Sequence, residues 1–166
     1  MKRATPEDKA TVINILSESF EQNKTVLSVV NHRIELIPKL MAYSFDKAMI
    51  LGEVWLNDDS TAVLIALCPI KAKLSVNSLL LDIRLLLSVI GISRVLEVLN
   101  RENEIKRRQP RTEFIHLWYI GEKKAHQGLG LGSQLLNNFL KLEKIKNLPI
   151  YLETSTLENY TLPNIL

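Results

Sequence analysis

The sequence contains a single cysteine, Cys68, among its 166 residues. One thiol excludes an intrachain disulfide framework and a thiolate cluster that would hold zinc, and we expect no metal. Cys68 lies at the end of the apolar run 62–68, which favours a packed interior side chain over a nucleophile. Internal repeats and low-complexity segments are also missing.

Long hydrophobic runs are scarce as well. The most apolar stretch, Leu79 to Ile92, is interrupted by Asp82 and Arg84 and is too short to span a bilayer. Residues 1–8 contain no apolar segment of the kind that secretory signals carry. We therefore expect a cytoplasmic protein with no membrane partner.

A large excess of either charge is missing too. The sequence has 21 Lys and Arg against 18 Asp and Glu, which gives a net charge of +3. Because no nucleic-acid-reading module is visible, this mild bias indicates an anionic small ligand rather than a nucleic-acid partner. The length and a hydrophobic content of 46% are typical of one globular domain with a core of its own.

The hydrophobic pattern predicts helices and strands in alternation. Thr5, Pro6 and two early acids mark a helix start after a short strand at 2–4. Further helices are predicted over 33–47, over 77–108 with a break near Gly91 and Ser93, and from Leu131 onward. Strands are predicted over 49–56 and 61–67 as a hairpin, over 114–120 and over 150–154. The last two strands flank a helix, so they should be parallel neighbours in an α/β (α+β) mixed sheet.

A glycine-rich turn joins the strand 114–120 to the helix that follows. Residues 125–133 read Ala-His-Gln-Gly-Leu-Gly-Leu-Gly-Ser, with glycine at every second position from 128 to 132. Such glycines leave backbone N–H groups uncovered, and a helix N-terminus adds unpaired donors and a partial positive charge. This combination indicates a site for a phosphate or pyrophosphate group.

Two familiar phosphate-binding motifs do not fit this turn. A P-loop requires a lysine directly after its last glycine, whereas Ser133-Gln134 follow here. A dinucleotide fingerprint requires G-x-G-x-x-G near the start of its domain, whereas this turn reads G-x-G-x-G and lies late in the chain. A merely tight turn would need one or two glycines, because each further glycine costs backbone entropy.

The segment Gln127–Gly132 matches Q/R-x-x-G-x-G/A and resembles the acetyl-CoA pyrophosphate loop of the GNAT acetyltransferase superfamily. The segments 116–121, 126–132 and 151–155 follow in the order of that family, and they look most like the branch that contains puromycin N-acetyltransferase. The likeness covers about Phe114 to Asn159. It implies a splayed central sheet flanked by helices, acetyl-CoA as cosubstrate, and acetyl transfer to a primary amine by direct attack.

The resemblance also assigns roles to individual residues. It implies that the pantetheine arm bonds the strand backbone, which can also polarise the thioester carbonyl. The residues in that role are Trp118, Tyr119, Ile120, Gly121 and Glu122. It implies that the pyrophosphate lies on Gln127, Gly128, Leu129, Gly130, Leu131, Gly132 and Ser133, and it matches Asn159 to a further cofactor contact. Lys123 and Lys124 either attract the CoA phosphates or are simply solvated.

Three side chains are candidate general bases: Glu53, Glu113 and His116, each on or beside a strand expected to line the cleft. His116 shares a strand face with Phe114 and Trp118, which favours a hydrogen-bonded core histidine. For Glu53, an exposed strand acid is the favoured interpretation. The acceptor amine is not indicated by any charge pattern.

The C-terminal part departs from the family pattern. Relatives continue through an Asn to Tyr-x-x-x-Gly-Phe, whose tyrosine often serves as general acid, and this sequence reaches Leu166 without that motif. Tyr160 has the wrong spacing, so no general acid is assigned. We expect one GNAT domain over 1–166 that is C-terminally incomplete. A CoA-binding or regulatory module with little or no catalysis is the alternative, and an NAD-type binding protein is a third. The leucine-rich stretch 79–99 is expected to be core rather than a homodimer face.

Overall fold

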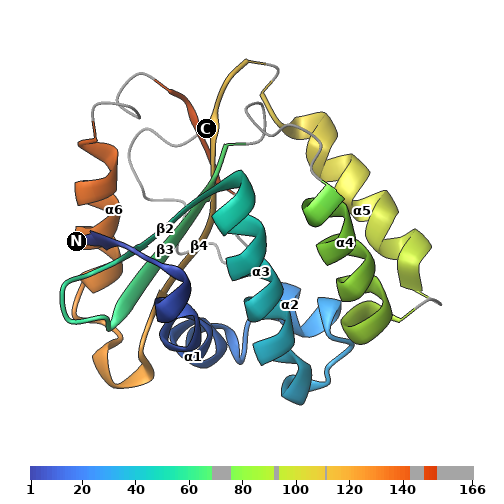
Figure 1. The fold of residues 1–166 in the computed structure, drawn as a ribbon, viewed down its shortest axis with the longest axis horizontal. Coiled ribbons are helices and arrows are strands. Elements are labelled where there is room, and N and C mark those ends of the chain that lie inside the picture. The colour runs from blue at the N-terminus through green and yellow to red at the C-terminus, as the bar shows by residue number, and fades with distance from the viewer. Residues whose placement is uncertain (69–75, 92–93, 111, 143–147, 153–166) are drawn as a thin grey trace.

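Five strands form one sheet whose spatial order is the order of the chain, β1-β2-β3-β4-β5 (Figure 1). The computed structural model describes residues 1–68, 76–91, 94–110, 112–142 and 148–152. The strands are β1 (Lys2–Arg3), β2 (Gly52–Leu56), β3 (Ala62–Leu67), β4 (Ile115–Glu122) and β5 (Ile150–Leu152). Neighbours from β1 to β4 are antiparallel, and β4 and β5 are parallel, which confirms the predicted hairpin and strand–helix–strand unit.

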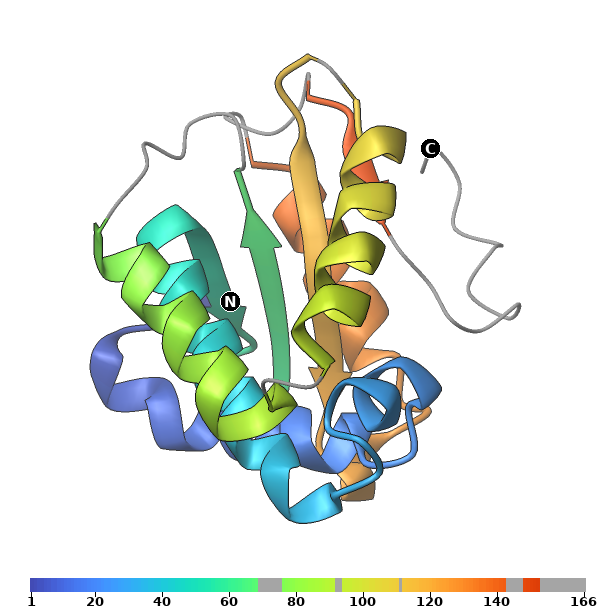
Figure 2. The same ribbon diagram turned by 90° about the vertical axis from the view of Figure 1, so that its right-hand side faces the viewer.

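Helices cover both faces of this sheet (Figures 1 and 2). The α-helices are α1 (Lys9–Phe20), α2 (Lys24–Val29), α3 (Ile37–Leu51), α4 (Val76–Leu85), α5 (Val95–Arg108) and α6 (Leu131–Leu140). Short helical turns are η1 (Pro6–Asp8), η2 (Ile34–Leu36), η4 (Leu86–Ile90) and η6 (Lys124–His126). Helices α1 and α3 pack on one face of the sheet, and among the described helices α6 packs on the other. None of the helices in the described segments has the length and apolar character needed to cross a bilayer.

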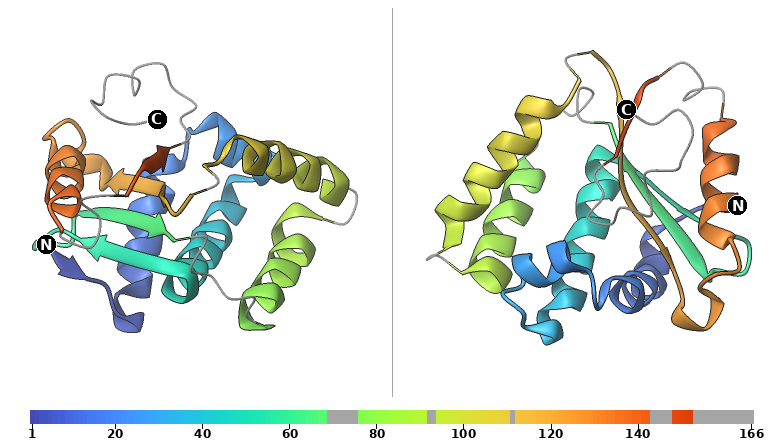
Figure 3. Two further views of the ribbon diagram at one scale, coloured as in Figure 1. Left: turned by 90° about the horizontal axis from the view of Figure 1, so that it is seen from above. Right: turned by 180° about the vertical axis from the view of Figure 1, so that it is seen from behind.

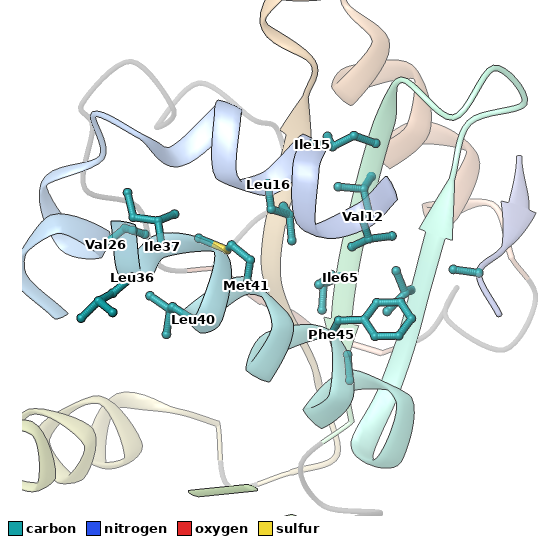
Figure 4. Close-up of a cluster of buried hydrophobic side chains, with 14 of the residues drawn as sticks. Val12, Ile15, Leu16, Val26, Leu36, Ile37, Leu40, Met41, Phe45 and Ile65 are labelled. Atoms are coloured by element: carbon teal, nitrogen blue, oxygen red, sulfur yellow. The ribbon is translucent and has the colours of Figure 1, made fainter. Parts of the chain in front are cut away.

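Two apolar clusters, one on each face, hold these layers together. The larger cluster lies between α1, α3 and the sheet and contains Leu16, Met41, Phe45 and Ile65, each at most 2% exposed (Figure 4). The smaller cluster holds α6 against β3 and β4. Residues of β3 alternate between the two clusters, because successive side chains of a strand point to opposite faces. The central strands are therefore fixed from both sides.

The start of the first helix follows the sequence signal. The Asp8 carboxylate accepts the Thr5 N–H at 3.0 Å, which closes a capping box before α1. Helix α2 is not anticipated by the apolar spacing. Its start is nevertheless marked by Asn23, whose side chain accepts the N–H groups of Thr25 and Val26 at 3.0 and 3.1 Å.

Two expectations about local structure are wrong. Residues 49–51 belong to α3 rather than to the strand, and the strand begins at Gly52, where a Cβ would lie 2.0 Å from the Ala66 carbonyl oxygen. The leucine-rich stretch is not core. Leu79, Leu80 and Leu87 are 60%, 57% and 63% exposed, although Val89 and Ile90 are buried. Helix α4 contacts the larger cluster through Leu85, and polar contacts also tie it to α3, since Asp82 accepts from Tyr43 at 2.7 Å and pairs with Lys47.

Candidate functional site

A β-bulge interrupts β4 at Trp118. Leu117 pairs with Ala66 and Tyr119 pairs with Ile65, so Trp118 has no partner in β3. As a result, Trp118 and Tyr119 both pack on the α1/α3 face. Their rings pack edge-on against Tyr43 and Phe20, with centroids 6.2 and 5.1 Å apart. The aromatic contacts fix the bulge on the strand for which the sequence predicts thioester and pantetheine contacts.

Beyond the bulge, one edge of β4 runs past β5 (Figure 3). The parallel pairing begins at Ile115–Ile150 and ends at Leu117–Leu152, whereas β4 continues to Glu122. Within the described segments, no strand pairs with this edge over residues 118–122.

The glycine turn follows β4 and leads into α6. Gly128 and Gly130 have φ angles of +81° and +74°, which side chains other than glycine adopt only with strain. Gly130 is the N-cap of α6. Among the described residues, no acceptor bonds the N–H groups of Gly130, Leu131 or Ser133. These donors and the helix dipole match the needs of a pyrophosphate group.

The Gly132 N–H, in contrast, is already bonded. It donates to Oε1 of Glu122, the last residue of β4. A Cβ on residue 132 would lie 2.9 Å from that oxygen and 3.0 Å from Cγ2 of Ile120. Gly132 therefore allows the first turn of α6 to approach β4 closely.

Helix α1 supports the connection from β4 to α6. The Lys124 N–H donates to Oε2 of Glu18 at 3.1 Å, and the Glu122 N–H donates to Oγ of Ser19 at 3.4 Å. Gly121 lies against Ser19 and Leu16, where a Cβ would lie 3.1 Å from the Ser19 side chain. Lys124 also pairs with Glu21 at 3.8 Å, and both side chains are exposed. The loop that carries the glycines is thus tied to α1 at its start.

The three candidate bases lie in different places. His116 is on β4 opposite Tyr151, with ring centroids 5.5 Å apart, and burial lowers its pKa to about 4. Its imidazole is therefore neutral at pH 7. Glu113 lies just before β4 and has its Oε1 shielded from solvent. Glu53 is on β2, which β3 separates from β4, and there it pairs with Arg3 at 3.4 Å and accepts from Trp55.

The structure brings together most of the residues that the sequence singles out. Residues 118–122 lie on β4 and residues 127–133 lie at the N-terminus of α6, and the hydrogen bond between Gly132 and Glu122 joins the two segments. Glu113 and His116 lie at the other end of β4, and Glu53 lies apart from it. Asn159 lies outside the described residues.

Two features of the site are missed by the sequence reasoning. The bulge at Trp118 has no local signal, because it depends on the register with β3. The bond from Gly132 to Glu122 has a weak local signal, since an acid that ends an apolar strand just before a glycine turn can cap the helix that follows.

Comparison with known proteins supports the fold. No protein-family model and no curated protein match the sequence. The chain is similar in structure to a protein from Corynebacterium glutamicum described as histone acetyltransferase HPA2 and related acetyltransferase. The TM-score is 0.68 at 19% identity, over 95% of this chain and 77% of that one. The mixed sheet flanked by helices is thus the fold of the GNAT acetyltransferases, and the predicted fold class is confirmed.

Proposed function

We propose that this protein is an acetyl-CoA-dependent N-acetyltransferase that acts on a primary amine by direct attack in a ternary complex. One observation carries the proposal: β4 runs past the described part of β5 and leads to the N-terminus of α6, where the N–H groups of Gly130, Leu131 and Ser133 have no acceptor among the described residues. This is a site for an extended ligand with an anionic end, and CoA has that shape. The resemblance of residues 114–159 to the branch of puromycin N-acetyltransferase points to the same chemistry.

Each part of the site has a role in this proposal. The backbone of residues 118–122 binds the pantetheine arm, and the N–H groups of Gly130, Leu131 and Ser133 bind the pyrophosphate. When bound, acetyl-CoA supplies an activated acyl carbon. Backbone N–H groups at the bulge of Trp118 polarise the thioester carbonyl and stabilise the negative charge that develops on its oxygen.

The transfer itself joins the amine nitrogen to the acyl carbon and breaks the carbon–sulfur bond. The amine loses one proton and the thiolate of CoA gains one, so the products are an amide and CoA. Glu113 and His116 remain the candidate bases on β4, acting directly or through water. Glu53 is the weaker candidate, because Arg3 and Trp55 already engage its carboxylate.

Isothermal titration with CoA, acetyl-CoA and NAD tests the cofactor assignment. We expect both CoA species to bind and NAD to leave the heat signal flat. Failure of acetyl-CoA to bind at millimolar concentration would remove the proposal. Thiol release from acetyl-CoA over a panel of primary amines then tests catalysis, and binding without turnover would favour a CoA-binding module instead.

A further inference from the structure

The Glu122 carboxylate lies at the position where the proposed site should receive an anion. Glu122 ends β4, and its side chain lies on the α6 face together with Ile120. From there it takes the N–H of Gly132, the second residue of α6. The neighbouring donors of Gly130, Leu131 and Ser133 have no acceptor in the described segments. One of the donors at this helix end is therefore already used by the chain itself.

The α6 N-terminus is the main positive partner of this carboxylate. Among the ion pairs between described residues, none joins Glu122 to a lysine or arginine. The helix has ten residues, long enough for its dipole to place a partial positive charge beside the half-buried Glu122 side chain. A hydrogen bond from a backbone N–H to a carboxylate is stronger than one to a neutral oxygen. Glu122 thus stabilises the turn while no ligand is present.

We propose that Glu122 is an internal competitor for the CoA pyrophosphate and sets the affinity of the site. The inference rests on the proposed function. A pyrophosphate on the donors of α6 either displaces the Glu122 carboxylate from the Gly132 N–H or lies beside it. Displacement removes a charge-assisted hydrogen bond, and close approach places two anions together, so both arrangements weaken binding. The residue that stabilises the empty turn therefore promotes release of CoA.

The experiment compares CoA binding by the wild type, Glu122→Gln and Glu18→Gln in the full chain. Glutamine keeps an acceptor for the Gly132 N–H and removes only the charge. Glu18 is the matched control, because its carboxylate also accepts a backbone N–H of this connection, that of Lys124. Isothermal titration gives the Kd for CoA, circular dichroism confirms folding, and Glu122→Ala serves as a second variant.

We expect Glu122→Gln and Glu122→Ala to lower the Kd for CoA about tenfold, which corresponds to about 1.4 kcal/mol, while Glu18→Gln leaves it within twofold. An unchanged or raised Kd in both Glu122 variants would overturn the inference, as would an equal gain in Glu18→Gln. If none of the proteins binds CoA, the proposed function itself fails. If the wild type binds and the Glu122 variants gain nothing, only the role of Glu122 fails.

Discussion

Replacing Gly132 by alanine should destabilise the protein through a contact between α6 and β4. The added Cβ would lie 2.9 Å from Oε1 of Glu122 and 3.0 Å from Cγ2 of Ile120, both closer than packed atoms normally allow. Displacing a hydrogen bond to a charged group costs about 1.5–3 kcal/mol. Alanine returns about 1 kcal/mol, because it forms helices more readily than glycine. We expect the free energy of unfolding to fall by about 0.5–2 kcal/mol.

The same contact makes the effect depend on Glu122. In a Glu122→Ala background the carboxylate is gone, and only the Ile120 methyl group remains close to the new Cβ. The cost of Gly132→Ala should then fall to about zero, which gives a coupling of about 0.5–2 kcal/mol between the two positions. Urea unfolding of the wild type, both single variants and the double variant measures this coupling. Ser133→Ala is the control, since the neighbouring Ser133 side chain is exposed.

Two results would refute this reasoning. If Gly132→Ala unfolds at the same or a higher urea concentration than the wild type, the close approach of α6 to β4 is not tight. If the penalties of the two single variants simply add, the Glu122 carboxylate is not what the methyl group displaces.

Three further predictions follow from the site, the buried histidine and the exposed helix. Gly130→Ala should cost about 1–2 kcal/mol in urea unfolding, because residue 130 has φ +74° and only glycine adopts that angle freely; an unchanged midpoint would contradict this. Burial lowers the His116 pKa from 6.5 to about 4, so the folded state binds fewer protons than the unfolded state between these values. Stability should therefore fall by about 2 kcal/mol from pH 7 to pH 5, and His116→Asn should remove that part of the pH dependence; an equally steep loss in the variant would speak against it. We propose that a second copy of the chain covers the exposed side chains of Leu80 and Leu87, so the wild type should sediment as a dimer and the double variant with glutamine at both positions as a monomer; a monomeric wild type would reject that pairing.

Local sequence signals were sufficient for most elements of the fold. Thr5 and Asp8 mark the start of the first helix, and the polar turn Asn-Asp-Asp-Ser at 57–60 marks the hairpin, because each signal acts within a few residues. The position of the glycine turn is also predicted from the sequence alone, since positive φ angles before the start of α6 favour glycine. The helix start, the hairpin turn and the glycine turn thus depend on residues that are close to one another in the sequence.

The remaining features depend on tertiary contacts that a linear pattern does not contain. Leucines at 79–87 have the spacing of a buried helix face, yet Leu79, Leu80 and Leu87 are exposed, and Leu85 and the Asp82 contacts join α4 to the rest of the fold. Glu53 lies on a strand that is expected from the sequence to line the cleft, but the strand order places β3 between Glu53 and β4. The bond between Glu122 and Gly132 joins the end of β4 to the start of α6, and the sequence does not show that the intervening turn brings these two residues together.

The bulge at Trp118 changes which residues of β4 face α6. Before it, Ile115 and Leu117 point to the α6 face, whereas after it Ile120 and Glu122 do so. Loss of one residue at this position would turn the Glu122 carboxylate toward Leu16 and Ser19 and bring Gly121 under α6. Along β4, positions that tolerate a polar side chain should therefore alternate with positions that do not, and this alternation should shift by one residue at position 118. A single unpaired residue thus decides whether the acid faces the helix end or the apolar core.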